Sequence, residues 1–232
     1  MPLLVPRQRV VAIDLPGFGA SPPLPGGGFD LGVVCERVEA AIAELGLERP
    51  AMVGHSLGGG VTVRYAAERP GSLRAVALIA PAGLIASGAV RPSWRHPRLH
   101  ALGRVALRAA IPLIASRPGL RERAFARVVG VPSSLDAQLA RELLMGAAQG
   151  RSTPAAGIEI VYAGLRDRLD ALTLPALVVW GGRDHVVSPR YAEPLRDALP
   201  DGRLLVLPDA GHVPMCEHPA EVAAAVLGLV HA

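Results

Sequence analysis

Short apolar runs alternate with amphipathic stretches along the chain, a pattern typical of alternating strands and helices. The apolar runs are rich in branched aliphatic residues, and Gly, Pro or Asp lies near most of their ends. They predict strands at Arg9–Asp14, Ala51–Gly54, Ala75–Ala80, Ala176–Trp180 and Leu204–Leu207. Because helical patterns separate most of these runs, we expect an α/β fold with a mostly parallel sheet.

Helical periodicity occupies the stretches between these runs. The clearest case is an apolar face on which Val34, Val38, Ala41, Ile42 and Leu45 recur at helical spacing. Proline at position 70 ends the helix predicted after the second strand. The further helices are predicted at Leu57–Arg69, Tyr191–Leu199 and Pro219–Val230.

One long segment, Pro81–Asp170, has helical signals but no good strand. It carries a net charge of +7, whereas the remainder of the chain carries −3. The positive net charge of the whole chain, +4, therefore comes from this segment. We therefore predict an α/β core made of residues 1–80 and 171–232, with residues 81–170 inserted as a basic helical cap.

Length and composition restrict the class of protein. A chain of 232 residues with 50% hydrophobic residues can bury one core, which excludes a disordered or collagen-like chain. The longest uncharged run, 75–90, contains a proline and is shorter than the roughly 20 residues that a membrane span needs. The N-terminus does not resemble a signal peptide, and Cys35 and Cys216 have no CxxC spacing. These features predict a cytoplasmic protein with two reduced thiols and without stable membrane insertion.

The most informative motif is Gly54-His55-Ser56-Leu57-Gly58, which lies between a predicted strand and a predicted helix. A serine on such a sharp turn exposes its hydroxyl, and the helix that follows offers free N–H groups. This is the nucleophile-elbow pattern, G-x-S-x-G. A Gly-rich turn without chemistry is the alternative interpretation of the same residues.

Two further motifs follow later predicted strands. Asp184 stands in Gly-Gly-Arg-Asp-His after one strand, and His212 stands in Ala-Gly-His-Val-Pro after the last. A neutral imidazole can accept the proton of a serine and return it to a leaving group. The order Ser56, Asp184, His212 is the chain order of the catalytic residues in α/β-hydrolases.

Four segments carry a resemblance to a known family: DLPGFGAS from Asp14, GHSLGG around Ser56, GGRDHVVS around Asp184, and AGHVPMCEHP around His212. With them the chain resembles the α/β-hydrolase superfamily, in its cap-bearing esterase and carbon–carbon-bond hydrolase branch. The resemblance implies that Ser56 is the nucleophile, His212 the general base and then acid, and Asp184 the residue that orients the imidazole. It also implies that the backbone N–H of Leu57 is an oxyanion donor and that the insertion is a helical cap.

The resemblance departs from the family at the front of the chain. Family members carry a His-Gly-type loop that supplies a second oxyanion N–H, and no such motif precedes Arg9. The strand associated with that loop would lie between two retained strands. We expect either a start codon assigned too late or a shortened protein with impaired activity, and the source of the second donor stays open.

Other residues receive lesser roles. His55, Trp94 and Val213 are predicted to contact substrate, while His185 and His218 are predicted at the surface or at a helix end. The arginines of the insertion form either a solvated face or a surface that attracts an anionic substrate or membrane. They are Arg91, Arg95, Arg98, Arg104 and Arg108, with Arg117–Arg127 beyond.

Several partner classes are not supported. No HExxH or paired-thiolate pattern indicates a metal site, and no cofactor is implied. Few aromatic residues accompany the arginines, which disfavours base stacking and hence nucleic acid. The expected partner is a small molecule, with the oligomeric state unassigned.

Together these observations predict a serine hydrolase that cleaves a small ester, lactone, thioester or related carbonyl compound through an acyl-enzyme on Ser56. The alternatives are a cofactor-free haloperoxidase-like or carbon–carbon-bond hydrolase, and a catalytically impaired or non-catalytic relative that acts by binding.

Overall fold

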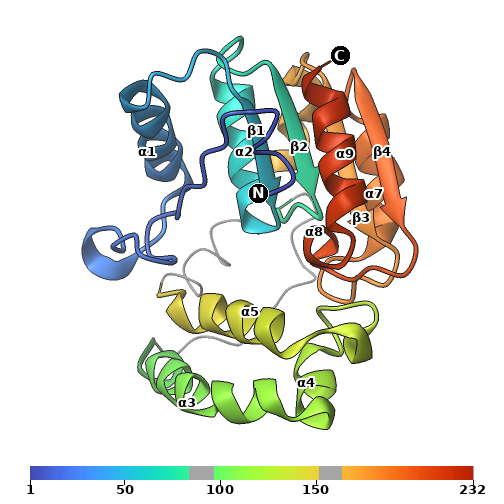
Figure 1. Ribbon diagram of the computed structural model, residues 1–232. Coiled ribbons are helices and arrows are strands. Elements are labelled where there is room, and N and C mark those ends of the chain that lie inside the picture. Colours follow the sequence, from blue (N-terminus) through green and yellow to red (C-terminus); the bar gives the residue numbers. More distant parts are fainter. Residues whose placement is uncertain (84–96, 152–163, 232) are drawn as a thin grey trace.

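The centre of the protein is a four-stranded parallel sheet (Figure 1). The structure, a computed structural model, describes residues 1–83, 97–151 and 164–231. The strands lie side by side in chain order, and the register aligns Ala51 with Ala75 at the start of the first pair. This arrangement confirms the predicted parallel α/β fold. The strands are β1 (Ala51–His55), β2 (Ala75–Ile79), β3 (Ala176–Gly181) and β4 (Gly202–Leu207).

The strand predicted at Arg9–Asp14 is wrong. These residues join no ladder of the described sheet, and Val11 and Ile13 are 39% and 43% exposed. A β-branched run has the composition of a strand, but it becomes one only when a neighbour pairs with its N–H and C=O groups. Among the described strands β1 has only β2 beside it, and its Val53 is 47% exposed.

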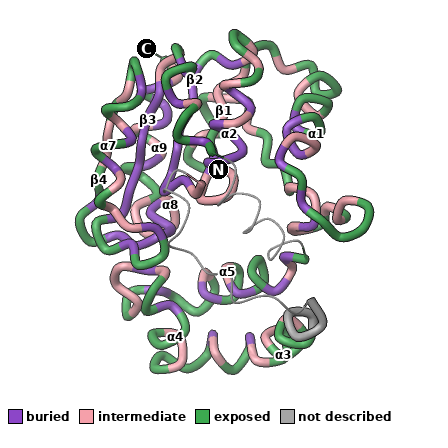
Figure 2. The backbone as a smooth tube through the Cα atoms, turned by 180° about the vertical axis from the view of Figure 1, so that it is seen from behind, coloured by how far each residue is buried: buried purple, intermediate pink, exposed green. Residues whose placement is uncertain are grey.

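Helices cover both faces of the sheet, because alternate side chains of the buried strands point to opposite faces. Val76 and Leu78 of β2 enter the core beneath α1 and α2. Ala77 and Ile79 of the same strand enter the core beneath α9. Figure 2 shows buried positions along β2 and β3 and on the inner sides of these helices. The helices of these two layers are α1 (Leu31–Glu44), α2 (Leu57–Glu68), α7 (Ala192–Asp197), α8 (Pro214–Glu217) and α9 (Pro219–Val230).

A separate layer of helices, the α3–α5 layer, lies beyond the carboxyl ends of the strands (Figure 1). It follows β2 in the chain and precedes β3, and it has a core of its own that includes Ile111, Phe125 and Leu144. The layer comprises α3 (Pro97–Ser116), α4 (Pro118–Phe125) and α5 (Ala137–Gln149). Short 3-10 helices complete the described elements at Pro25–Gly27, Pro132–Ser134, Leu165–Ala171 and Pro189–Tyr191.

No helix in the described ranges is both long enough and apolar enough to span a membrane.

Candidate active site

The loops at the carboxyl edge of the sheet carry the three residues singled out by the sequence. Ser56 directly follows β1, Asp184 follows β3 and His212 follows β4. Because the strands are parallel, their carboxyl ends share one edge, where α/β proteins collect functional groups. The α3–α5 layer lies beyond that same edge (Figure 1).

Ser56 occupies a strained backbone conformation, with φ 50° and ψ −115°, directly before α2. A positive φ is costly for a residue with a Cβ, and such strain persists only where the surroundings impose it. Here the Ser56 N–H donates to the Ile79 carbonyl at 2.9 Å, and the Ser56 carbonyl accepts from the Ala82 N–H at 2.8 Å. The end of β2 therefore holds Ser56 in a sharp strand-to-helix turn.

Two glycines around this turn permit its close packing. A Cβ on Gly54 would lie 2.3 Å from the Gly58 carbonyl oxygen, and one on Gly59 would lie 2.6 Å from the Pro81 side chain. A Cβ on Gly58 would meet no atom within 4 Å. The second glycine of the G-x-S-x-G pattern is thus not required by steric contact, whereas the glycine after it is.

Asp184 and His212 form a buried pair. The Nδ1–H of His212 donates to Oδ2 of Asp184 at 2.8 Å, and the two residues are only 7% and 3% exposed. Oδ1 of Asp184 accepts from the N–H groups of Val186 and Val187 at 2.7 and 2.9 Å. The carboxylate is therefore held by backbone donors while it fixes the imidazole, and Nε2 of His212 is left as the nitrogen for proton transfer.

His55 also contacts His212, through its backbone and its ring. Its Nε2–H donates to the His212 carbonyl at 2.7 Å, and the two ring centroids are 4.8 Å apart. Burial, and after it the neighbouring His212, lower the pKa of His55 to about 4. A neutral His55 anchors the His212 backbone without placing a second positive charge beside the imidazole.

This lowered pKa predicts an acid sensitivity of the fold. Between about pH 6.5 and pH 4 the unfolded chain protonates His55 while the folded chain does not, so the free energy of unfolding falls as pH falls. The expected contribution is roughly 1–3 kcal/mol across that window. Denaturant unfolding of His55→Gln, which keeps a donor for the His212 carbonyl, should show a shallower fall than wild type. An identical pH slope in the two proteins would contradict this account.

The N-terminus of α2 adds a polar group to the site. Leu57 is the first residue of that helix, and the first N–H groups of a helix have no partner within it. Such N–H groups, at the positive end of the helix dipole, favour a negatively charged oxygen. This is the position at which the sequence predicts an oxyanion donor.

The remaining residues named from the sequence are not part of the Asp184–His212 pair, and one of them lies outside the described residues. Val213 is 7% exposed and belongs to the core of the α3–α5 layer. Trp94 lies outside the described residues. His185 is exposed, and His218 contacts the carboxylates of Asp209 and Glu221 at 3.1 and 3.5 Å. No cluster of His, Cys, Asp or Glu suited to a metal ion occurs in the described part of the chain.

Glu217, the last residue of α8, was not among the site residues predicted from the sequence. Its two carboxylate oxygens accept from the N–H groups of Gly211 and Gly130, each at 2.8 Å. Glu217 stands five residues after His212, within the AGHVPMCEHP segment. Its place in this segment was the one signal in the sequence that could have indicated a role. Its partner Gly130 lies 87 residues away in the chain, so the bond between them could not be predicted.

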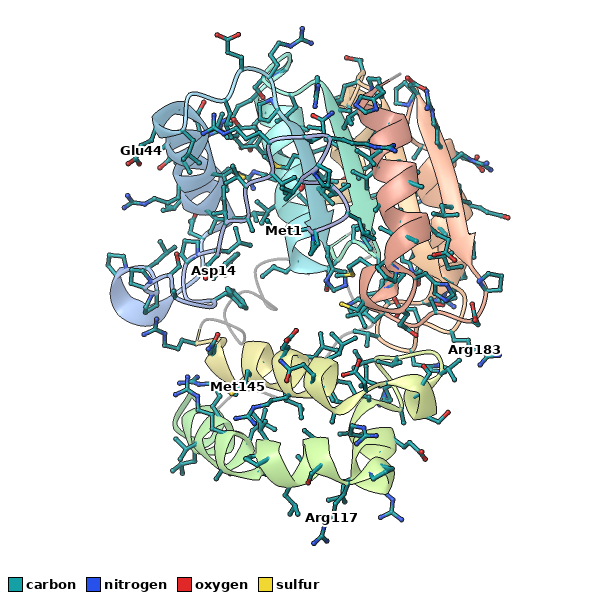
Figure 3. The ribbon with its side chains drawn as sticks, viewed as in Figure 1. Met1, Asp14, Glu44, Arg117, Met145 and Arg183 are labelled. Atoms are coloured by element: carbon teal, nitrogen blue, oxygen red, sulfur yellow. The ribbon has the colours of Figure 1, made fainter. Side chains whose placement is uncertain are left out.

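A cleft of about 500 Å³ lies between the α3–α5 layer and the loop before α1. Among the described residues that line it are Arg104, Arg108 and Arg151, together with one carboxylate, Asp14. Figure 3 shows Asp14 on that loop and Met145 on α5 across from it. Two of the insertion's arginines considered in the sequence analysis, Arg104 and Arg108, therefore face a recess rather than a flat surface.

Comparison with known proteins places these features in a family. The family model for the alpha/beta hydrolase fold matches residues 1–219. The dihydrolipoyllysine-residue acetyltransferase component of the acetoin cleaving system from Cupriavidus necator is 33% identical over 92% of this chain, which spans 54% of that protein. The pimeloyl-[acyl-carrier protein] methyl ester esterase from Chromobacterium violaceum is 30% identical, with coverage of 93% of this chain and 81% of the esterase.

A solved structure shows the same fold. The hydrolase from Pseudomonas aeruginosa PA01 superposes with a TM-score of 0.72 at 24% identity, covering all of this chain and 83% of that one. The chain spans about half the length of the acetyltransferase components that it matches, including a second one from Pseudomonas putida. Since the family model covers most of its residues, the chain belongs to the alpha/beta hydrolase fold family.

Proposed function

We propose that the protein is a serine hydrolase that cleaves a small ester, lactone or thioester through an acyl-enzyme on Ser56. The observation that carries this proposal is the buried Asp184–His212 pair, at 2.8 Å, on the same sheet edge as the strained Ser56 turn. A carboxylate that fixes the Nδ1–H tautomer leaves Nε2 basic, as removal of a proton from serine requires. The esterase from Chromobacterium violaceum among the relatives supports ester chemistry.

The first half of the reaction forms the acyl-enzyme. Nε2 of His212 takes the hydroxyl proton of Ser56 while Oγ bonds to the substrate carbonyl carbon. The carbonyl oxygen becomes an oxyanion, which the N–H of Leu57 stabilises. Collapse breaks the bond to the leaving alcohol or thiol, which receives the proton from His212. Asp184 stabilises the imidazolium throughout this exchange.

The second half releases the acid. Water attacks the acyl carbonyl as His212 Nε2 accepts one of its protons, and a second oxyanion forms at the same N–H. Its collapse breaks the bond to Ser56 Oγ, and His212 returns the proton to that oxygen. The enzyme recovers its starting state, and the net reaction adds one water across the cleaved bond.

The proposal is tested by turnover of nitrophenyl esters of increasing acyl chain length. We expect saturable release of nitrophenol above the rate in buffer, and a burst equal to the enzyme concentration if deacylation limits the rate. Folded protein that hydrolyses nitrophenyl esters of every chain length, a nitrophenyl thioester and a simple lactone no faster than buffer does would overturn the proposal.

The arginine-lined cleft predicts a preference among these substrates. The described lining of the cleft holds three arginines and one carboxylate, an excess of positive charge that should raise the local concentration of an anionic ester. Salt should screen this attraction. We expect the ratio of kcat/KM for a succinyl ester to that for a neutral ester of the same length to fall roughly ten-fold between low and high salt. The Arg108→Gln protein should start from a lower ratio, whereas Arg37→Gln, at an exposed position of α1, should match wild type. A ratio that does not change with salt would show that these arginines do not attract the anionic ester and only interact with solvent.

A further inference from the structure

The backbone of the His212 loop is bonded directly to the α3–α5 layer. The His212 N–H donates to the carbonyl of Val128, in the segment that follows α4, at 2.7 Å. Beside it, the guanidinium of Arg183 donates to the Gly130 carbonyl at 3.3 Å. Figure 3 shows Arg183 on the sheet side of this junction, next to the connection between α4 and α5. The proposed catalytic base is therefore held from a layer that lies outside the sheet.

Glu217, in α8, forms hydrogen bonds to both the His212 loop and the α3–α5 layer. One of its oxygens accepts from the Gly211 N–H, next to His212, and the other accepts from the Gly130 N–H across the junction. Hydrogen bonds to an ionised acceptor are the stronger class, and both oxygens of this carboxylate are used. A single side chain thus joins the His212 loop to the α3–α5 layer.

The backbone around Gly130 and the backbone of the His212 loop are in close contact. A Cβ on Gly130 would lie 1.9 Å from the Asp209 carbonyl oxygen, and one on Gly211 would lie 2.5 Å from the Val128 carbonyl oxygen. The next residue, Val213, is buried in the core of the α3–α5 layer. Contacts therefore bind the residues on both sides of His212, and His212 itself, to that layer.

We propose that Glu217 is a positioning residue: by bonding to both Gly130 and Gly211, it fixes the position of the proposed base His212 relative to the α3–α5 layer. The role rests on the proposed function, because it acts through His212 and touches no reacting atom. The bond from Gly130 to Glu217 lies in the connection between α4 and α5, whereas the arginine-lined cleft is bordered by Ala148 and Gln149 at the end of α5. Loss of the Glu217 bonds would let the layer shift at this connection and would move His212 relative to Ser56.

Glu217→Gln is the test, because it preserves shape and removes one of the two bonds. The amide oxygen accepts one N–H, while the amide NH₂ faces the other N–H and cannot accept it. Glu221→Gln is the matched control, since that carboxylate is exposed on the next helix and contacts only His218 among the described residues. Circular dichroism and thermal unfolding establish that both proteins are folded.

Two readouts separate positioning from general stabilisation. Hydrogen exchange should accelerate at least ten-fold at Gly130 and Gly211, and also at His212, whose N–H bonds to Val128 and not to Glu217. Ester turnover should lose roughly ten-fold to a hundred-fold in kcat with little change in KM, because the base is misplaced while substrate binding is retained. Glu221→Gln should change neither readout.

Faster exchange at Gly130 and Gly211, with unchanged exchange at His212 and unchanged kcat, would overturn the proposal. Unchanged exchange at all three amides would also overturn it. The exchange readout needs no substrate, so wild-type protein without turnover would refute the proposed function and leave the mechanical coupling to be decided by exchange alone.

Discussion

Replacement of Ser56 by alanine is expected to abolish ester turnover. The substitution removes Oγ, the protein atom that bonds covalently to the substrate in the proposed mechanism, so the acyl-enzyme cannot form. Loss of a nucleophile of this kind lowers kcat by about 10⁴- to 10⁶-fold. Serine and alanine both carry a Cβ, so the cost of the positive φ of 50° at this position is similar for the two residues. The fold should therefore be retained.

The control for this experiment is Ser72→Ala. Ser72 lies before β2, at the amino edge of the sheet, and its hydroxyl donates to the Arg69 carbonyl. We expect its kcat/KM to equal that of wild type within about two-fold, since it lies at the opposite edge of the sheet from the site. Ester hydrolysis by Ser56→Ala at more than a hundredth of the wild-type rate would require another nucleophile.

Replacement of Asp184 by asparagine is expected to cost about 10⁴-fold in kcat, the second largest effect. An asparagine that keeps the N–H bonds of Val186 and Val187 on its oxygen turns its NH₂ toward His212 Nδ1. The imidazole would then carry its proton on Nε2, the nitrogen that must accept the proton of Ser56. Because the amide also lacks charge, the imidazolium of the transition state loses its counter-ion.

A pH profile identifies this mechanism. Asp184→Asn should regain part of its activity as the pH rises and hydroxide replaces the lost base, whereas exposed Asp201→Asn should follow the wild-type profile. Asp184→Asn with at least a tenth of wild-type kcat at neutral pH would show that Asp184 does not orient the base.

The buried strands were the most predictable part of the fold. A strand covered on both faces is a continuous apolar run, and the segments that became β2 and β3 have that form. Arg9–Asp14 has a similar composition but lacks a paired neighbour among the described strands. Pairing depends on distant segments, so composition alone overestimated this strand.

The residues of the candidate site were predictable because each stands in a local motif at the end of a strand. The contacts that hold them were less so. The bond from Gly130 to Glu217 joins positions 87 residues apart, and the bond from His212 to Val128 involves only backbone atoms. No side-chain pattern in the sequence encodes a bond to a distant backbone N–H group, which is why Glu217 was not singled out.

The central claim is that the Asp184–His212 pair activates Ser56 as a nucleophile. Its most direct measurement is the reaction with a fluorophosphonate, followed by intact mass and peptide mapping. We expect one phosphonyl adduct per chain, located on Ser56, and labelling slowed at least a hundred-fold in folded His212→Gln. Folded wild-type protein that forms no adduct, or forms it on another residue, would contradict the account.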